Sequence, residues 1–457
     1  MSLAVHCDRL FDGQEVHGPS LVTVEGDTVR AVEAVGEGDV NGRATHRCAC
    51  LIPGLIDCHL HLAGYSESDP RRAPFQPMEN SLRLLTLNGI TTVRDTGNSI
   101  EAIRFARRRH QQENGGRASP RVFGTGPLLD VPPLVWPFSR IVTDPEAGRR
   151  QVSLLHAEGM DWIKSYRNIG YDELRAIVDE AGERDMDVAA DVGAVTARQA
   201  AEIGVRSLEH AANLFDPRSF PELDPEEFGG AQGRSRLWSR VDLDSEAVAS
   251  LVELLLEKGT FLCPTLIVSH RWSSLEAMVE EPYLDYMVGV MPYHKYFKRM
   301  QGTLGMMIGR RFMNRYLPVP KPSRRERRQI EQGLENLRRI VALLYRAGVK
   351  IAAGTDTPNP SVVPGFSLHQ ELELLVEGGL EPVEALRLAT SSAAELLRQP
   401  DLGSVRPGAR ADLLLLDGDP TADITETMSI QLLLQGGEAV DREAVLEDFL
   451  STFKDGS

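Results

Sequence analysis

Residues 53–61 read Pro-Gly-Leu-Ile-Asp-Cys-His-Leu-His, and the rest of the chain can be interpreted from this stretch. After Pro-Gly the run is short and apolar, which predicts a buried β-strand whose side chains share a face at every second position. His59 and His61 therefore point the same way as Asp57. Two imidazoles on one face can hold a transition metal. Because a His-x-His pattern also arises by chance, the prediction depends on what the other strands bring to the same place.

Length and charge narrow the classes of function. The chain has 457 residues, which is too long for one small core and predicts a large domain plus a smaller one. The formal net charge of -16 argues against nucleic-acid binding and against general attraction to anionic membranes. No apolar run approaches a membrane span, and the first residues lack a signal-like basic and apolar pattern. The scattered cysteines fit reduced thiols, so we expect a cytoplasmic protein without an integral membrane segment.

Short β-like runs lie at both ends of the chain. Residues 1–53 contain several, separated by Gly and Asp turns, and residues 403–457 contain more. Neither set is large enough for an independent domain. We therefore predict one small composite β-sandwich domain built from both ends, with residues 54–402 forming a larger domain between them.

In residues 54–402, β-rich runs alternate with helical patterns. The predicted strands are 55–61, 90–95, 121–126, 161–166, 187–192, 205–210, 260–266 and 349–356. The predicted helices are 79–88, 99–113, 145–158, 172–184, 196–203, 244–258, 326–347 and 381–398. Eight strands alternating with helices imply parallel pairing, so we expect an α/β fold with a closed, TIM-like (β/α)8 barrel. An open doubly wound sheet is the alternative, although no Gly-x-Gly-x-x-Gly follows the first predicted strand.

Polar residues that can bind metals fall at the ends of these predicted strands. They are His59 and His61 on the first, Lys164 on the fourth, Asp191 on the fifth, His210 on the sixth and Asp356 on the eighth. In a barrel of this type the chemistry sits at the carboxyl ends of the strands. We therefore expect these side chains to converge on one functional site.

These residues and their surroundings resemble the amidohydrolase superfamily, in particular its imidazolonepropionase-like and prolidase-like branch. The matching stretches are Leu51-Ile-Pro-Gly-Leu-Ile-Asp-Cys-His-Leu-His61, Gly89-Ile-Thr-Thr-Val-Arg-Asp95, Asp161-Trp-Ile-Lys164, Ser207-Leu-Glu-His210 and Ala353-Gly-Thr-Asp-Thr357. The resemblance covers nearly the whole chain and is poorest at about 213–243 and 269–330. It implies a (β/α)8 barrel with a composite β-sandwich and a metal-activated water that attacks an amide or related bond.

The resemblance also implies a ligand set. His59, His61 and Asp356 would hold a first divalent metal, while His210 would bind a second one. Lys164 would be N-carboxylated and bridge both ions, since a buried, neutral lysine can react with carbon dioxide to give a carbamate. The alternative is an ordinary lysine paired with a nearby carboxylate. The expected metal is zinc, with one or two ions bound, and manganese is the alternative.

One position departs from the family pattern. Asp191 stands at the end of the fifth predicted strand, where the family usually has a histidine. A carboxylate can bind zinc, so Asp191 is retained as a metal ligand, but it makes the site less positive and favours harder metals such as manganese. Three outcomes stay open: an altered two-metal site, a one-metal site on His59, His61 and Asp356, or a site that binds no metal.

Asp356 is the residue that we expect to carry protons. It would take a proton from the attacking water and deliver it to the leaving nitrogen, unless it serves as a structural ligand alone. His270 follows the seventh predicted strand and could reach substrate, because loops at this face of a barrel carry specificity. The remaining histidines lie in helical or polar surroundings, and we interpret them as structural or surface residues.

Residues 269–330 form a long insertion before the eighth predicted strand. Between His294 and Arg328 there are eleven Lys or Arg residues against one acid, Glu326. We interpret the insertion as a lid whose Arg310 and Arg311 would receive an extended, carboxylate-bearing substrate such as a peptide. The alternatives are a solvated basic helix pair over a small core and association with an anionic membrane surface.

The sequence therefore predicts a metal-dependent hydrolase that cleaves C–N bonds. The favoured substrate is a peptide, a modified peptide or an N-acyl amino acid. A hydrolase of a cyclic amide or imidazolone ring is the alternative enzyme, and a catalytically silent binding protein of the same fold is the alternative outside catalysis. The family resemblance also suggests a homodimer.

Overall fold

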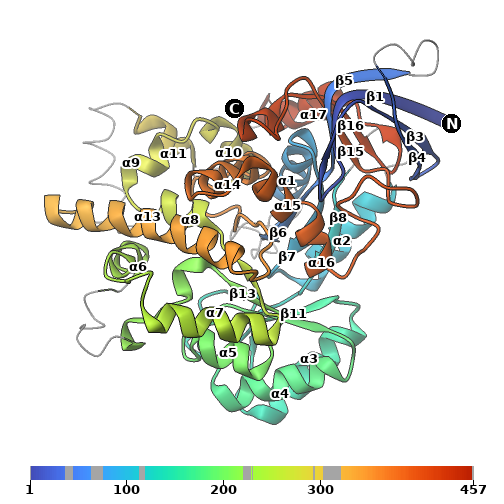
Figure 1. Ribbon diagram of the computed structural model, residues 1–457. Helices are drawn as coiled ribbons and strands as arrows, with labels where there is room; N and C mark the ends of the chain where they lie inside the picture. The colour runs from blue at the N-terminus through green and yellow to red at the C-terminus, as the bar shows by residue number, and fades with distance from the viewer. Residues whose placement is uncertain are drawn as a thin grey trace.

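The computed structural model describes residues 2–36, 45–62, 76–112, 119–219, 228, 230–291, 294–301 and 321–454. Arg310 and Arg311, two of the predicted substrate-binding residues, lie outside the described residues. Figure 1 shows a sheet that contains the N-terminal strands and a larger body in which strands alternate with helices. No helix in the described part of the chain combines the length and apolar character needed to cross a bilayer.

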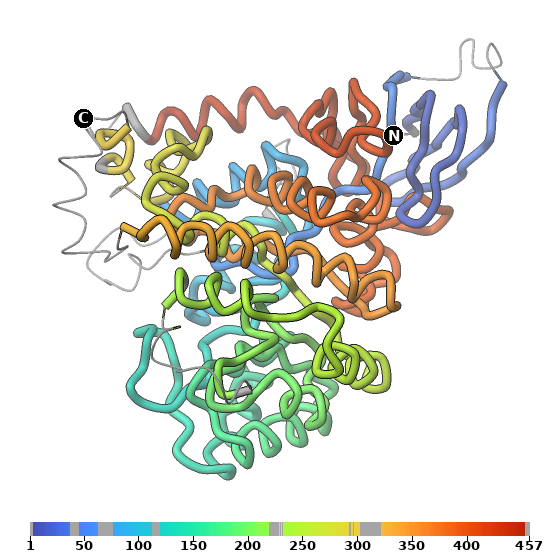
Figure 2. The backbone as a smooth tube through the Cα atoms, turned by 60° about the vertical axis from the view of Figure 1, so that its left-hand side comes forward, coloured from blue at the N-terminus to red at the C-terminus, as the bar shows by residue number. Residues whose placement is uncertain are grey.

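Strands from both chain ends form one eight-stranded sheet, in the order β17-β16-β15-β5-β1-β3-β4 with β2 paired to β1. These strands are β1 (Ser2–Phe11), β2 (Val16–His17), β3 (Ser20–Glu25), β4 (Thr28–Ala34), β5 (His46–Pro53), β15 (Leu413–Leu416), β16 (Ile430–Gln435) and β17 (Glu438–Ala439). Figure 2 shows the blue N-terminal strands next to chain from the orange-red C-terminal part, while the red final helix runs away from them toward the C-terminus.

Direct pairing of β5 with β15 joins the two chain ends. Leu413 lies opposite Pro53, and Leu415 lies opposite Leu51, in antiparallel register. Leu413 and Leu415 belong to a separate apolar cluster that includes Val22 of β3. Because the two ends meet edge to edge, the strands in the described ranges form one sheet here and not two facing sheets. The predicted sandwich is therefore not confirmed.

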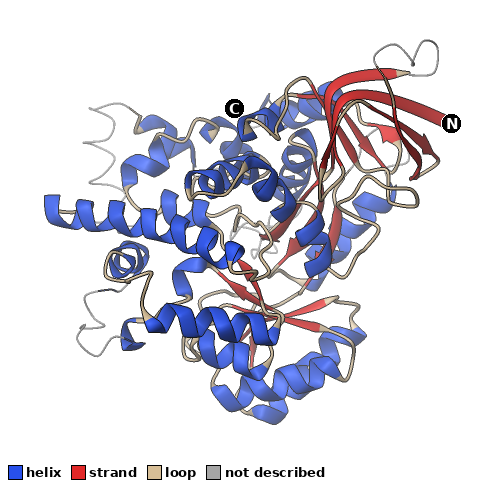
Figure 3. Cartoon of the chain, in the orientation of Figure 1, coloured by secondary structure: helices blue, strands red, loops and turns tan. Residues whose placement is uncertain are grey.

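The middle of the chain carries two parallel sheets, with the orders β6-β7-β8 and β10-β9-β11-β12-β13-β14. Their strands are β6 (Leu55–Leu60), β7 (Ile90–Asp95), β8 (Arg121–Gly124), β9 (Leu129–Asp130), β10 (Arg140–Ile141), β11 (Trp162–Ser165), β12 (Asp187–Ala190), β13 (Ser207–Glu209) and β14 (Phe261–Cys263). Figure 3 shows these parallel strands in red with helices in blue packed around them. The predicted α/β class and the parallel pairing are confirmed.

Residues 351–357, at the predicted eighth strand, connect the two parallel sheets through isolated bridges. Ile351 bridges Leu262 of β14, and Thr357 bridges Leu60 of β6, both in parallel orientation. This segment therefore lies where the eighth strand of a barrel would lie, between the seventh and the first.

The closed barrel itself is not confirmed, because the strands are divided over two sheets. Near the end of the eighth segment, Asp356 has a φ of 62°, which interrupts the extended backbone that a strand needs. On the opposite side, a hydrogen bond of 3.0 Å from Asp161 N to Gly124 O joins the neighbourhoods of β8 and β11.

Helices follow most of the parallel strands, as the sequence pattern predicts. The α-helices are α1 (Gln76–Leu87), α2 (Ile100–Gln112), α3 (Pro145–Ala157), α4 (Tyr171–Gly182), α5 (Ala197–Ile203), α6 (Gly230–Trp238), α7 (Glu246–Lys258), α8 (Leu266–Arg271), α9 (Leu275–Val279), α10 (Leu284–Val290), α11 (His294–Arg299), α13 (Arg324–Arg346), α14 (Phe366–Glu377), α15 (Pro382–Leu388), α16 (Ser391–Leu396) and α17 (Arg442–Lys454). Short 3-10 helices are η1 (Ala211–Asn213), η2 (Pro217–Ser219) and η4 (Ile424–Met428).

Two predicted elements differ from the structure for local reasons. The helix predicted over 381–398 is split into α15 and α16, because Thr390 between them has φ and ψ of -134° and -99°, which are not helical. The strand predicted over 260–266 ends at Cys263, because Leu266 begins α8 and its N–H donates to the buried carboxylate of Glu371 at 2.9 Å.

The main apolar core lies between the parallel strands and their helices. It contains Leu60 and Val93 from the strands and Leu85 and Ile177 from the helices. Every residue of β6 and β7 is buried, as expected for parallel strands that are covered on both faces. The polar residues of these strands are therefore buried as well, and each needs a partner.

Candidate metal centre

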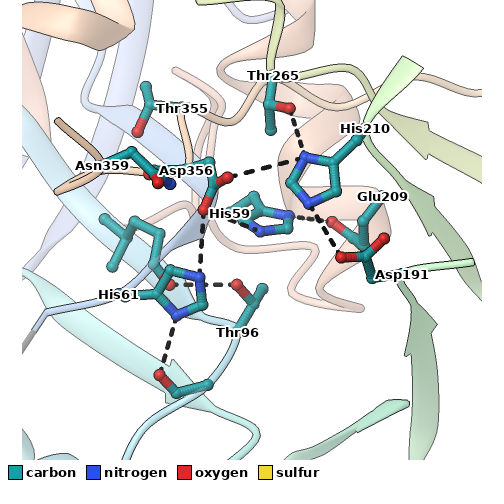
Figure 4. Close-up of polar contacts among 12 residues, drawn as sticks. His59, His61, Thr96, Asp191, Glu209, His210, Thr265, Thr355, Asp356 and Asn359 are labelled. Carbon is teal, nitrogen blue, oxygen red and sulfur yellow. Dashed lines mark hydrogen bonds and ion pairs between the residues drawn. The ribbon is translucent and has the colours of Figure 1, made fainter. Parts of the chain in front are cut away.

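Three side chains of metal-ligating type meet where β6 ends. The Nε2 atoms of His59 and His61 lie 3.6 and 3.2 Å from Asp356 Oδ1. One ligand atom from each residue lies within 4.8 Å of the other two. Figure 4 shows the three side chains turned toward one another. We call this group the His59–His61–Asp356 triad, and its two imidazoles and one carboxylate are donors that zinc prefers.

Hydrogen bonds decide which imidazole nitrogens face Asp356. His61 Nδ1–H donates to Gly97 O at 2.9 Å, and His59 Nδ1–H donates to Glu209 Oε2. Because the proton of each ring stands on Nδ1, each Nε2 can present a lone pair to the same space. Without a metal, a proton on His61 Nε2 can occupy this space as a hydrogen bond to Asp356 Oδ1, and a metal ion would take the place of that proton. The donor set therefore fits a metal ion.

The backbone around Asp356 is held against β6. Asp356 N donates to His59 O at 2.7 Å, and Thr355 donates to the Asp57 carboxylate through its N–H at 3.2 Å and its hydroxyl at 2.7 Å. A Cβ added to Gly354 would lie 2.7 Å from His59 Cβ, so this close approach requires glycine. Asp57 thus positions the segment that carries Asp356.

Burial and charge act in opposite directions on the pKa values of the triad. Burial alone would raise the pKa of Asp356, but its hydrogen bond with His61 and the charges of His210 and His59 hold that pKa below its usual value. Burial, reinforced by the charge of Lys164, lowers the pKa of His59 to about 3. Burial opposes protonation of His61 too, yet the contact with Asp356 outweighs it and raises the pKa of His61. An ionised Asp356 and a neutral His59 are the forms that bind metals.

Glu209 supports the triad, and the sequence analysis did not assign it a role. Its Oε1 accepts hydrogen bonds from Arg94 Nη2 at 2.8 Å and from Ser207 Oγ at 2.5 Å, while Oε2 accepts from His59. Arg94 also donates to Cys58 O at 2.6 Å and lies over the Trp162 ring. A carboxylate behind a metal-facing imidazole fixes the tautomer and the orientation of the ring.

The signal for this pair was present in the sequence. Arg94 and Glu209 are charged residues in stretches that were predicted as buried strands, and a buried charge requires a partner of opposite sign.

Lys164, Asp191 and His210 form a second group on β11, β12 and β13, or just after them. His210 Nε2 lies 3.7 Å from Asp191 Oδ2, and its Nδ1 lies 3.9 Å from Asp356 Oδ2. His210 Nδ1 is also 2.7 Å from Thr265 Oγ1. Lys164 Nζ is buried and has no hydrogen-bond partner among the residues that the structure describes. The six predicted metal ligands thus lie in one region, three in the triad and three beside it.

The second group differs from the triad in its partners. Asp191 Oδ2 accepts a hydrogen bond from Arg167 Nε at 3.2 Å, and Oδ1 accepts from Asn213 Nδ2 at 2.9 Å. Burial would raise the pKa of Asp191, but the charges of Arg167, His210 and Lys164 lower it. Burial lowers the pKa of Lys164, and the carboxylates of Glu209 and Asp191 oppose that shift. Arg167 and Asn213 were not singled out from the sequence.

His270, which we predicted to bind substrate, lies half-buried on α8. Within the described ranges its ring makes no hydrogen bond or ion pair with the six predicted metal ligands. Burial lowers the pKa of His270 to about 4, and the neighbouring Arg271 adds to that shift. The structure therefore does not join His270 to the two groups at the strand ends.

Comparisons with known proteins extend over nearly the whole chain. The model of the amidohydrolase family matches residues 50–440. The ochratoxinase of Aspergillus niger is 23% identical over 493 aligned residues, which cover 93% of this chain and 84% of that protein. Among solved structures, a bottromycin amidohydrolase has a TM-score of 0.71 at 21% identity, covering 100% of this chain and 91% of that one.

A Xaa-Pro dipeptidase crystallised with methionine in its active site is also similar, with a TM-score of 0.66 at 20% identity and coverage of 96% and 99% of the two chains. At these identities the structural likeness establishes the fold. The family match spans most of the chain and includes every residue of the triad. The chain therefore belongs to the amidohydrolase family and is a hydrolase.

Proposed function

We propose that this enzyme uses a divalent metal ion to cleave a C–N bond in a peptide, a modified peptide or an N-acyl amino acid. The observation that carries the proposal is the His59–His61–Asp356 triad, whose ligand atoms lie within 4.8 Å of one another. Zinc suits two imidazoles and a carboxylate, and manganese is the alternative. An ion held there would polarise a carbonyl oxygen and make a water molecule more acidic.

Asp356 is the proposed proton carrier. Its Oδ1 faces the two Nε2 atoms of the triad, and its Oδ2 lies 3.9 Å from His210 Nδ1. Oδ2 is thus the oxygen available to accept a proton from an attacking water and to deliver it to the leaving nitrogen. His210 would keep Asp356 ionised until that transfer, because a nearby imidazole favours the carboxylate.

Lys164 is proposed to carry a carbamate. A buried amine without a hydrogen-bond partner among the described residues is costly as an ammonium ion, and the neutral amine is the form that reacts with carbon dioxide. A carbamate there would supply a carboxylate-like oxygen donor to a metal ion. Asp191 and His210, the other two predicted ligands, lie beside the triad.

Two observations support the proposed substrate class: the names of the relatives and the insertion over 269–330. The relatives are named for an ochratoxin, for Xaa-Pro dipeptides and for bottromycin, and the insertion over 269–330 is long in sequence, which suits contact with an extended substrate such as a peptide. Helices α8 to α11 of this insertion lie next in the chain to β14, at the face where barrel enzymes place specificity loops. His270, Arg310 and Arg311 stay candidates for substrate binding on this basis.

We also propose how the barrel closes, where the domains begin and end, and in which state the enzyme exists. The eight strands would close into a barrel, with residues 351–357 as the eighth, and the bridges from Ile351 and Thr357 support this closure. The domains would span residues 1–53 with 403–457, and residues 54–402. A homodimer in the cytoplasm is the proposed state of the enzyme.

The test combines metal content with hydrolysis of a panel of Xaa-Pro dipeptides, other dipeptides and N-acyl amino acids. We expect bound metal in wild type, hydrolysis of at least one class, and a loss of about 10²- to 10⁴-fold in turnover for Asp356→Asn. Asp417→Asn, an exposed carboxylate at the end of β15, is the matched control. Wild-type protein that binds neither zinc nor manganese would contradict the proposal.

A further inference from the structure

The carboxylate of Asp191 has both oxygens engaged by protein donors. Arg167 Nε donates to Oδ2 at 3.2 Å, and Asn213 Nδ2 donates to Oδ1 at 2.9 Å. Asp191 is 2% exposed, so this pairing takes place away from bulk water. A buried carboxylate that already has a guanidinium partner is poorly placed to bind a metal as well.

Arg167 is fixed in this position by its own surroundings. It follows β11, and its carbonyl oxygen accepts a hydrogen bond of 2.7 Å from Ala194 N in the loop after β12. Asn213 connects the pair to a second guanidinium, since its Oδ1 accepts from Arg234 Nη1 at 3.1 Å. Two guanidinium groups thus stand around the one carboxylate of Asp191.

The triad and the second group can be compared for metal binding. In the described part of the chain, the triad has three ligand atoms within 4.8 Å, whereas no such group contains Asp191 or His210. A cation bound to Asp191 Oδ2 would lie next to Arg167, and charges of the same sign repel at this distance. The residues present therefore fit one divalent ion at the triad and do not fit a second ion at Asp191.

We propose that the Arg167 guanidinium, held by Asp191, takes the place of a second metal ion, so that this enzyme binds one divalent ion per chain. Arg167 supplies a fixed positive charge beside the triad. About a third of its side chain is exposed, at 32%, which leaves N–H groups available to a substrate carboxylate or oxyanion. This inference rests on the proposed function, because it presupposes the ion at the triad.

The first test counts metal ions on protein purified and reconstituted in zinc or manganese with bicarbonate present, so that a carbamate on Lys164 can form. We expect one ion in wild type, one in Asp191→Asn and none in His59→Ala. Two ions in wild type would overturn the inference and leave the proposed function standing. One ion in wild type and none in Asp191→Asn would also overturn it, because Asp191 would then be a ligand. No ion in wild type would overturn the proposed function and the inference together.

A second measurement keeps the proposal falsifiable if a single variant folds poorly. Arg167→Met leaves the charge of Asp191 buried without its guanidinium partner, whereas Arg167→Met/Asp191→Asn removes both charges. We expect the double variant to melt at a higher temperature than Arg167→Met and to retain one ion. Arg108→Met, at an exposed arginine of α2, is the control for loss of a guanidinium. The pairing would be overturned if the melting temperature of the double variant fell by the sum of the decreases measured for Arg167→Met and for Asp191→Asn.

Discussion

The two halves of the site use similar residue types and differ in what surrounds them. In the triad, His59 Nδ1–H donates a hydrogen bond to Glu209 and His61 Nδ1–H donates one to Gly97 O. Both Nε2 atoms therefore face Asp356. In the second group, Asp191 is neutralised by Arg167, and His210 contacts a hydroxyl that can donate or accept. A strand-end position therefore predicts where a ligand-type side chain lies, while the partners of that side chain decide whether it is available to a metal.

Glu209 is the residue that makes the triad different, and its removal should have the largest effect. Glu209→Gln leaves Arg94 without its buried counter-charge and gives His59 Nδ1 a weaker, neutral partner. We expect metal affinity to fall about 10- to 100-fold and the free energy of unfolding to fall by about 3–5 kcal/mol. Chelator competition and urea unfolding would measure the two quantities.

Glu371→Gln is the matched control for that variant. Glu371 is also a buried carboxylate, but it accepts from the backbone N–H groups of Leu266 and Ile267 at 2.9 and 2.7 Å and supports α8. Glu371→Gln should keep its affinity for metal, because the hydrogen bonds of Glu371 hold the start of α8 and not the triad. If Glu209→Gln bound metal with wild-type affinity, the hydrogen bond from His59 to Glu209 would not be needed for metal binding.

The sequence predicts the triad well for a physical reason. The carboxyl ends of parallel strands gather at one edge, so residues at those ends converge whether or not their partners are known. His59 and His61 could be placed from the alternation of one strand, and Asp356 from the end of another. The strands β6, β7, β11 and β12 begin and end within two residues of their predicted bounds.

What could not be predicted depends on tertiary partners. Arg167 lies in a loop without periodicity, so nothing in the sequence indicates that it would reach Asp191. Asp356 adopts a positive φ because the surrounding backbone holds it there, which no local pattern of non-glycine residues reveals. The charges of Arg94 and Glu209 signalled that each needed a partner, but not which one.

A pH series tests Glu371 itself, because the carboxyl group that holds the start of α8 is titratable. Burial raises the pKa of Glu371 to about 8 from an ordinary value of 4.5. Between these values the unfolded chain loses the proton while the folded chain keeps it, so stability falls as the pH rises. We expect the wild-type free energy of unfolding, relative to Glu371→Gln, to fall by about 1.4 kcal/mol per pH unit between pH 5 and 7.

Urea unfolding of metal-free protein at pH 5, 6 and 7 would measure this slope. Metal-free protein is required, because ion binding to the triad depends on pH for its own reasons. A difference between wild type and Glu371→Gln that stays constant over this range would show that Glu371 is ionised throughout. The start of α8 would then be held by a permanent charge, as His59 is by Glu209.

The smallest expected effect tests whether the two halves are independent. Thr265 Oγ1 lies 2.7 Å from His210 Nδ1, and the residue has a φ of 47°. Thr265→Val keeps the β-branched shape and the same backbone strain, so the hydroxyl is the feature that is lost. We expect the free energy of unfolding to fall by about 1 kcal/mol and the metal content to stay unchanged, because His210 is not part of the triad. Thr265→Ser keeps the hydroxyl and is the control for it. If Thr265→Val lost its metal and Thr265→Ser did not, His210 would be a ligand of the ion at the triad, and the two halves of the site would have to be treated as one.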